Sequence, residues 1–236
     1  ELINRIVSQT RLARRLVENL LDLNRIEEGR LLPAPSFFSI GELVRACLDD
    51  ELPTFQARKL RHTLELPPQE LLCFGDREMI AQVLHNVLNN AAKYAQTHIA
   101  LQGTLEGFSE EAGGQLALSV TDDGRGIDLA QQRTVFDKYV KLESQGGGSG
   151  LGLYISRQMM ELHHGDIGVE SQPGQWTRFT IRLPNLFVPE QLPDLTPCQQ
   201  RRVCILSASK PTGQLLVGVL VEAGLIELSQ VGAPAQ

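Results

Sequence analysis

The sequence predicts an α+β fold, a two-layer α/β sandwich in which helices cover one sheet, preceded by a long coiled-coil-like helix. Two patterns indicate it: short stretches typical of strands are interspersed with amphipathic helical stretches, and the chain begins with a heptad repeat. The composition is that of a globular protein, because 42% of the 236 residues are hydrophobic and 21% are charged. A chain of this length forms one large or two small domains.

The charge and the cysteines exclude several classes of protein. The formal net charge of -6 gives no electrostatic argument for binding nucleic acid or an anionic membrane, and no apolar run reaches the roughly 18 residues of a membrane-spanning helix. The four cysteines are scattered without a C-x-x-C pair, so we expect no disulfide scaffold, no zinc site and a reducing, cytoplasmic setting. No signal peptide opens the chain, and we expect it to be a fragment of something longer.

The N-terminal segment predicts one long helix with a coiled-coil seam. The seam positions follow alternating steps of four and three residues: Leu2, Ile6, Gln9, Ala13, Leu16, Leu20 and Leu23. Gly29 and Pro33 end this helix. Because a lone helix in water cannot bury such a seam, we expect it to pack either against partner helices in a four-helix bundle or against its own domain.

Periodicity along the rest of the chain predicts alternating elements. Helices are expected at 39–56, with Ser39 as the N-cap, and at 76–95, 149–162 and 212–223. Strands are expected at 60–66, 99–105, 116–121 and 202–206, and as a closing hairpin at 167–171 and 177–183. The stretch 106–114 is expected to be a polar loop, and 185–197, which holds three prolines, a linker.

The helix expected at 76–95 carries a polar stripe. Its members lie at positions i, i+4, i+7 and i+8 and therefore share one face: Asn86, Asn90, Lys93 and Tyr94. Amide oxygens and an ammonium group suit hydrated Mg²⁺ and phosphates, and a polar stripe on an otherwise apolar helix needs partners if it is buried. Taken alone, the stripe is more typical of a solvent-facing helix surface.

A second polar segment, Asp122-Asp-Gly-Arg-Gly-Ile127, directly follows an apolar strand. A carboxylate at a strand end can accept a hydrogen bond from an exocyclic amine such as that of adenine, and glycines let the backbone approach a flat ligand. A plain turn and a calcium loop are the alternatives, and the lack of further acidic ligands argues against calcium. Downstream, Phe136 and Tyr139 form a short aromatic pair that by itself indicates core packing.

A glycine-rich run at 146–153 leads into the next expected helix. Its backbone N–H groups and the positive end of that helix suit a phosphate. The run is not a Walker loop, because no G-K-[ST] follows, and it is not a dinucleotide fingerprint, because no strand immediately precedes it. Alone, it fits a linker as well as a phosphate site.

In their order and spacing, the four segments resemble the N, G1, F and G2 boxes of the histidine-kinase catalytic and ATP-binding domain. That domain belongs to the gyrase-type ATPases with the Bergerat fold, so the resemblance implies a two-layer sandwich of this type. The resemblance covers about residues 1–184. The stretch 20–29 resembles the end of the second helix of the family's dimerisation and phosphotransfer hairpin, and 163–171 and 179–184 resemble the end of its ATPase domain.

The resemblance implies ATP and Mg²⁺ as cofactors and assigns roles to matching positions. Asn90 would hold Mg²⁺ through its amide oxygen, Lys93 would lie near phosphate, and Asp122 would recognise the adenine amine. The other nucleotide-site positions that it implies are Asn86, Tyr94, Gly124, Gly126, Ile127, Gly148, Gly150, Leu151, Gly152 and Thr177. Catalysis would rest on positioning the γ-phosphoryl group and neutralising its charge, without covalent work by this domain.

The same resemblance implies the organisation of a hybrid sensor kinase in two-component signalling. The expected parts are the second hairpin helix at 1–33, the ATP-binding domain at 36–184, a linker at 185–200 and the start of a truncated, degenerate receiver-like domain at 201–236. The implied protein is an autokinase that forms a homodimer, or a heterodimer with another kinase, and signals to a response-regulator or receiver aspartate. It would bind no nucleic acid. It would meet a membrane only through segments missing here, as the cytoplasmic region of an inner-membrane-anchored bacterial protein.

Three departures from the family pattern keep other functions open. None of the histidines has the sequence setting of a phosphate acceptor, so that residue is expected on a first hairpin helix outside this chain: His62, His85, His98, His163 and His164. The lid at 140–147 is short. Trp176 stands where the family usually has glycine, so its ring could either crowd the adenine pocket or merely pack beside it. A non-catalytic or weakly catalytic regulator that pairs with another kinase is the alternative. A gyrase-, chaperone- or mismatch-repair-type ATPase is a third interpretation, against which the N-terminal helix argues.

Overall fold

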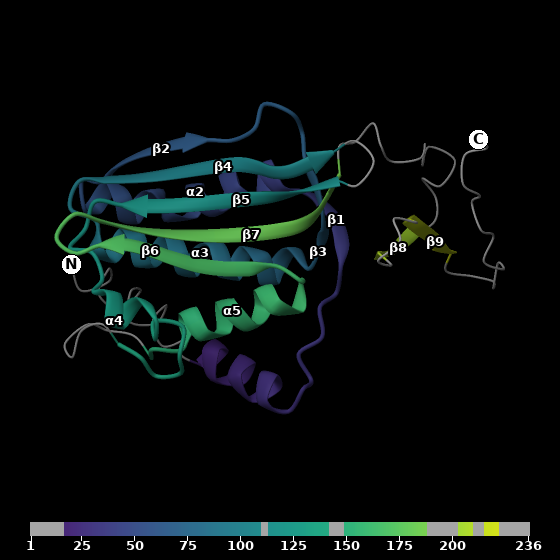
Figure 1. Cartoon of the computed structure of the whole chain (residues 1–236), viewed down its shortest axis with the longest axis horizontal. Coiled ribbons are helices and arrows are strands. Elements are labelled where there is room, and N and C mark those ends of the chain that lie inside the picture. The colour runs from purple at the N-terminus through teal and green to yellow at the C-terminus, as the bar shows by residue number, and fades with distance from the viewer. Residues whose placement is uncertain (1–16, 110–112, 142–148, 188–202, 210–214, 222–236) are drawn as a thin grey trace.

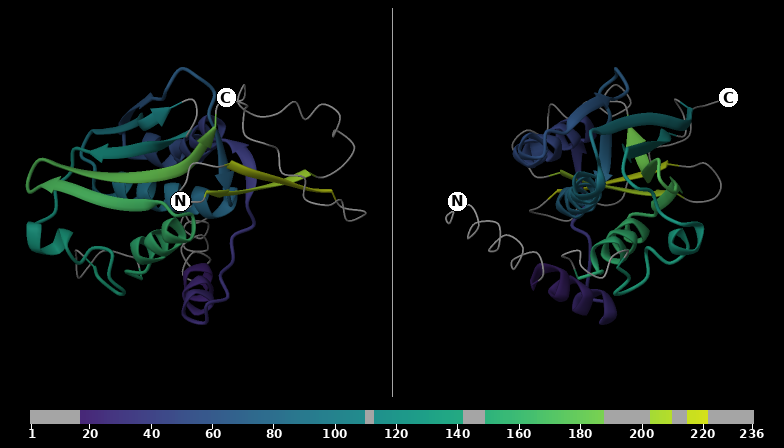
Figure 2. Two further views of the ribbon diagram at one scale, coloured as in Figure 1. Left: turned by 45° about the vertical axis from the view of Figure 1, so that its right-hand side comes forward. Right: turned by 90° about the vertical axis from the view of Figure 1, so that its left-hand side faces the viewer.

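The computed structural model describes residues 17–109, 113–141, 149–187, 203–209 and 215–221. Most of them form two layers, one sheet with helices packed against one of its faces (Figure 1). The rotated views show the same separation of sheet and helices (Figure 2). This architecture confirms the predicted two-layer fold class.

The larger sheet has seven strands in the order β1-β3-β7-β5-β4-β2, and β6 also pairs with β7. The bounds are β1 (Ser36–Ser39), β2 (Arg61–Glu65), β3 (Leu72–Gly75), β4 (His98–Ser109), β5 (Gly113–Asp122), β6 (Asp166–Gln172) and β7 (Trp176–Phe187). The pairing of β2 with β4 is parallel, and the other pairings are antiparallel. The register of the two central strands places Asp122 of β5 opposite Thr177 of β7.

The helices are α2 (Ile40–Ala57), α3 (Arg77–Tyr94), the short α4 (Leu129–Gln132) and α5 (Gly152–Leu162). α2 begins as predicted, because the Ser39 hydroxyl accepts a hydrogen bond from the Glu42 N–H at 3.3 Å. α3 begins after Asp76, whose Oδ1 accepts hydrogen bonds from the N–H groups of Glu78 and Met79. These two caps set where each helix starts relative to the sheet.

The core lies between α3 and the sheet. One side of α3 contributes side chains that are almost fully buried: Ile80, Val83, Leu84, Val87 and Leu88. They belong to one cluster with inward-facing residues of the central strands: Ile99, Leu101, Leu118 and Ile181. Burial of each such side chain contributes about 1.5–3 kcal/mol. The buried side of α3 therefore fixes the direction in which its polar stripe points.

The opposite face of the sheet is polar. Arg182 of β7 lies within 3.4 Å of Glu106 in β4 and 3.6 Å of Asp166 in β6. Arg178 pairs with Glu170 on the same face. Exposed pairs of this kind contribute little to stability, but they identify which side of each strand faces away from the helices.

The N-terminal helix, described over 17–27, contacts the rest of the domain through two polar pairs. Gln82 Nε2 of α3 donates a hydrogen bond to Asp22 Oδ2 at 2.8 Å. Lys138 Nζ lies 2.6 Å from Glu27 Oε1, and this contact raises the pKa of Lys138. The helix therefore packs partly on its own domain.

The described seam residues of this helix face in different directions. Leu23 is buried in the core cluster, whereas Leu20 is 51% exposed beside the exposed Val17 and Leu21. An outward-facing apolar edge is available for a partner helix, so both expected modes of packing retain support. The earlier seam positions lie outside the described residues. None of the described helices is both long and apolar enough to cross a membrane.

Two expected boundaries differ in the structure. β4 and β5 continue through most of the stretch expected as the loop 106–114, because cross-strand pairing persists there and Gln115 Nε2 donates to Glu106 Oε2 at 3.1 Å. β7 continues past Pro184 to Phe187, because Leu186 is buried and pairs with Cys73 of β3.

The prediction of a helix at 212–223 is wrong. Leu215–Val221 forms strand β9, which pairs antiparallel with β8 (Val203–Ser209). Valines at alternate positions of this stretch favour a strand over a helix. β8 itself agrees with the strand expected at the start of the tail.

Candidate nucleotide-binding site

The polar stripe of α3 lies next to the buried side of the helix. Asn86 Nδ2 donates a hydrogen bond to the Ser156 hydroxyl of α5 at 2.9 Å. Lys93 Nζ donates to Tyr94 Oη at 3.0 Å and lies 4.8 Å from the centre of the Tyr94 ring. Among the described residues, the partly buried Asn90 side chain has no hydrogen-bond partner. Its amide is therefore available to a ligand.

Asp122 is a carboxylate buried at the end of β5. Strand alternation turns it toward the helices, and it is only 3% exposed. The Gly124 N–H donates to its Oδ1 at 3.0 Å, and within the described ranges this is the one hydrogen bond to the carboxylate. Burial raises the pKa of Asp122 to about 6, although the Gly124 hydrogen bond opposes the shift. The second oxygen is free to accept from a ligand.

Gly124 is required by close approach of the backbone. A Cβ at this position would lie 2.5 Å from Asp122 Oδ1 and 2.5 Å from the Tyr94 carbonyl oxygen, closer than any real contact. The glycine thus lets the loop after β5 close against the end of α3. The resemblance implied this residue, and the structure gives the steric reason.

A chain of hydroxyl groups lies beside Asp122. Thr177, its buried cross-strand partner, has its Oγ1 3.1 Å from Ser171 Oγ in β6. The Ile127 N–H donates to that same Ser171 hydroxyl at 2.8 Å. Ser171 therefore ties the loop carrying Gly126 and Ile127 to the strand pair. Sequence reasoning missed Ser171, because only the register of β6 brings it next to Thr177.

The start of α5 lies against Asn86. A Cβ on Gly152 would overlap Asn86 Oδ1, so only glycine allows this helix start to approach α3. Gly150 has a φ of +72°, and its carbonyl accepts from the Tyr139 N–H at 3.0 Å. Leu151 is buried, and its N–H donates to the Ser149 hydroxyl. Gly148, the remaining predicted residue of the run, lies outside the described residues.

The neighbouring carboxylate, Asp123, has a structural task. It accepts hydrogen bonds from the backbone N–H groups of Gln96 and Thr97 and from the Thr97 hydroxyl. Although burial raises it, these bonds hold the pKa of Asp123 well below its usual value. Of the acidic pair, only Asp122 is directed inward.

Of the aromatic pair, Phe136 packs in the core as predicted, whereas Tyr139 does not. Phe136 is buried and packs edge-on against Phe179 of β7, with ring centres 6.3 Å apart. Tyr139 is exposed. Phe136 therefore belongs to the core, and Tyr139 enters the site through its backbone contact to Gly150.

Trp176 does not share the face of β7 that carries Thr177. Its ring lies 5.4 Å from the Arg178 guanidinium, whose Nε donates to the Thr121 hydroxyl. Thr121 and Arg178 face away from the helices, because their strand neighbours Asp122 and Thr177 are buried toward them. The indole therefore packs on the open face, which favours the second of the two alternatives, that the ring does not crowd the pocket.

These contacts bring most of the predicted residues to one region between α3, the end of β5 and the start of α5. A buried carboxylate suited to an amine lies at one end, and amides beside a glycine-rich helix start lie at the other. No cluster of three or more His, Cys, Asp or Glu side chains in the described part of the chain suits a metal ion. Amides, waters and ligand phosphates are a donor set that fits Mg²⁺.

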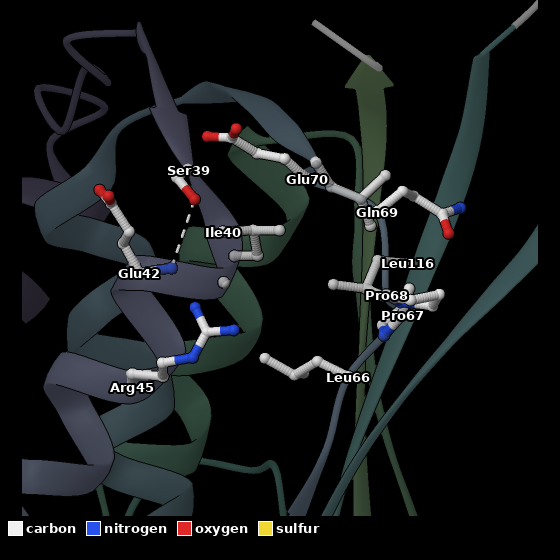
Figure 3. A pocket seen from close by; sticks show the side chains of 12 residues that line it. Ser39, Ile40, Glu42, Arg45, Leu66, Pro67, Pro68, Gln69, Glu70 and Leu116 are labelled. Atoms are coloured by element: carbon white, nitrogen blue, oxygen red, sulfur yellow. Dashed lines mark hydrogen bonds between the residues drawn. The ribbon is translucent and has the colours of Figure 1, made fainter.

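A separate cavity of about 310 Å³ lies at the other end of β5, next to Leu116 (Figure 3). It is formed by the start of α2 and the segment before β3, with Arg45 and Leu66 among its walls. The length of β5 separates this cavity from Asp122, so it is not part of the candidate site.

Comparison with known proteins gives the family. Residues 75–186 match the family model described as histidine kinase-, DNA gyrase B- and HSP90-like ATPase. The circadian input-output histidine kinase CikA of Thermosynechococcus vestitus is 33% identical over 89% of this chain and 31% of that protein. The adaptive-response sensory kinase SasA of Synechocystis is 29% identical over 78% of this chain and 48% of that protein. The chain thus spans less than half the length of either relative.

Solved structures share the fold. The histidine kinase AdeS of Acinetobacter baumannii superposes with a TM-score of 0.62 at 23% identity, over 78% of this chain and 83% of that one. Full-length ShkA, solved in complex with AMPPNP, gives a TM-score of 0.66 at 21% identity, over 75% of this chain and 37% of that one. Residues 75–186 therefore form a histidine kinase-, DNA gyrase B- and HSP90-like ATPase domain, and the relatives that the chain resembles are sensor histidine kinases.

Proposed function

We propose that the chain binds Mg-ATP between α3, the end of β5 and the start of α5, and that it is the catalytic part of a sensor histidine kinase. The observation that carries the proposal is the inward carboxylate of Asp122, which has one donor from its own loop and an oxygen left for a ligand. The adenine amine would donate to this oxygen. Thr177 and its partner Ser171 would face the same base.

The other end of the site would hold the phosphates. Asn90 offers a side-chain amide without a partner among the described residues, Asn86 presents its Oδ1 toward Gly152, and Lys93 supplies positive charge. Bound Mg²⁺ would neutralise phosphate charge. The contribution of this chain would be to orient the γ-phosphoryl group for attack by a histidine ring nitrogen, with departure of ADP. The acceptor histidine would belong to a hairpin of which residues 1–33 form the second helix.

The exposed apolar edge of the N-terminal helix supports an assembly. Leu20 and its exposed neighbours would pack in a helical bundle with a second kinase protomer. Downstream, the phosphoryl group would pass to a response-regulator or receiver aspartate in a two-component pathway of the cytoplasm. Sedimentation of a protein that contains both hairpin helices should show a dimer, and a monomer would contradict the assembly.

Titration of the 236-residue chain with AMPPNP, with and without Mg²⁺, tests the nucleotide site. We expect saturable binding that Mg²⁺ strengthens and that guanine nucleotides do not reproduce, because a carboxylate accepts from the amine of adenine but repels the carbonyl of guanine. An absence of binding at millimolar nucleotide would overturn the proposal.

A regulator that binds nucleotide without phosphorylating histidine is the second candidate. It is favoured by the polar pairs Asp22–Gln82 and Glu27–Lys138, which dock the N-terminal helix on the ATPase domain. Autophosphorylation of a protein with both hairpin helices decides between the two. Labelling of a histidine supports the kinase, and nucleotide binding without labelling supports the regulator.

A further inference from the structure

One polar contact stands out in the packing of α5 against α3. Both helices contribute buried apolar side chains to the core cluster, among them Val83, Ile155 and Met159. Ser156, only 2% exposed, accepts the hydrogen bond from Asn86 Nδ2 at 2.9 Å. A buried hydroxyl is costly unless it is paired, so this contact fixes the Asn86 side chain with respect to α5.

The contact also decides which end of the Asn86 amide faces the site. Because the amide is planar, a nitrogen committed to Ser156 leaves Oδ1 directed away from Ser156. Oδ1 lies against Gly152, where even a Cβ would overlap it. Gly152 is the first residue of α5, so the amide oxygen is presented at the positive end of that helix.

We propose that Ser156 is a positioning residue that orients the Asn86 amide, so that its oxygen serves the magnesium–phosphate end of the nucleotide site. This inference rests on the proposed nucleotide site and adds a residue to it. Ser156 lies on α5 four residues after Gly152, outside the four segments that resemble the N, G1, F and G2 boxes. It acts through Asn86 and does not itself contact the ligand.

The test measures the affinity of the 236-residue chain for Mg-AMPPNP and for adenosine in wild type and in Ser156→Ala. Loss of one hydrogen bond of ordinary strength predicts about a 2- to 12-fold loss of Mg-AMPPNP affinity. Adenosine affinity should stay within twofold, because Asp122 and Thr177 are untouched. Ser119→Ala is the matched control: this serine donates to the Gln102 carbonyl within the sheet, away from the site, and its loss should change neither affinity.

A double-mutant cycle with Asn86→Ala separates positioning from a merely structural role. If Ser156 acts through Asn86, its replacement should have no further effect on Mg-AMPPNP affinity once the amide is gone. An equal loss in both backgrounds, or a parallel loss of adenosine affinity, would overturn the inference. Wild-type affinity in Ser156→Ala would overturn it too while leaving the nucleotide site intact, whereas a wild-type chain that binds no nucleotide would overturn both.

A measurement on the unmutated chain guards against a variant that fails to fold. In ¹⁵N-labelled protein, one of the two Asn86 side-chain amide protons should exchange slowly with solvent, because it is bonded to a buried hydroxyl. Fast exchange of both protons would contradict the contact on which the inference rests.

Discussion

Asp122 and Glu51 are both buried carboxylates, at 3% and 4% exposure, but they differ in their partners. Asp122 receives a single described hydrogen bond, from the backbone of its own loop. Glu51 of α2 accepts from Asn89 Nδ2 at 2.9 Å and lies 3.4 Å from His85 Nδ1, both on α3. Two side chains of a neighbouring helix thus contact Glu51, whereas Asp122 has one described partner, from its own loop. The number of internal partners, and not burial itself, distinguishes the carboxylate that we propose to bind adenine from the one that joins two helices.

The environment of His85 fits a structural role for Glu51. Cys47 and Glu51 raise the pKa of His85 to about 10 against the cost of its partial burial, and Asp50 lies 3.5 Å from Nε2. A protonated ring held between acidic groups joins α2 to α3. This cluster contributes to packing on a face of α3 where no predicted nucleotide-site residue lies.

Replacement of Asp122 by alanine should produce the largest effect on binding. A hydrogen bond to a charged group contributes about 1.5–3 kcal/mol, so adenine-nucleotide affinity should fall about 10- to 100-fold. Thermal stability should stay the same or rise, because burial already disfavours the charged carboxylate. Calorimetric titration and thermal melts of the variant measure both. Unchanged affinity would mean that the adenine site has been misplaced.

Glu51→Ala should show the opposite pattern. It removes the acceptor of Asn89 and the partner of His85, so the free energy of unfolding should fall by about 1–3 kcal/mol. Urea denaturation measures this loss, and Glu51→Gln, which keeps an acceptor oxygen, serves as the milder control. Nucleotide affinity of the folded variant should match wild type. A specific loss of nucleotide binding with normal stability would remove the distinction between the two carboxylates.

The sequence predicts the parts of the fold whose signals are local. The N-cap Ser39 and the long apolar side of α3 identify the central helices, and alternation identifies the middle strands. The short strands β1 and β3 escaped prediction, because each has four residues and depends on its neighbour for pairing.

The residues of the candidate site also fall into two groups, those that the sequence predicts and those that only the structure reveals. The order of the motifs predicts Asn90, Asp122 and the glycines, since their chemistry and spacing are visible along the chain. The order of the motifs does not identify Ser156 or Ser171, because both act through partners that are distant in the sequence. Ser156 contacts Asn86, which is 70 residues away, and Ser171 contacts Ile127, which is 44 residues away. The direction of Trp176 likewise follows only from the strand register.

Acid should weaken nucleotide binding at the Asp122 site. With a pKa of about 6 the carboxylate is mostly charged at pH 7.5 and mostly protonated at pH 5, so affinity for adenosine should fall about tenfold over that interval if the charged form binds. Adenosine is the suitable probe because it carries no phosphate to titrate. Titrations of Asp122→Asn should show weak affinity without this pH dependence. An equally steep profile in the variant would assign the effect to another group.

The smallest expected effect concerns alkaline stability and tests the Glu51 side of the comparison. Because the pKa of His85 is raised in the folded state, its protonated ring stabilises the fold fully below about pH 6.5, and this contribution is lost as the pH rises through about 10. Wild type should therefore exceed His85→Gln in unfolding free energy at pH 6, and the gap should narrow toward pH 10.5. Urea denaturation of both proteins across this range measures the gap. A constant gap would show that the ring contributes by packing alone. Nucleotide affinity should stay equal in the two proteins throughout, because His85 lies on a face of α3 that carries no predicted nucleotide-site residue.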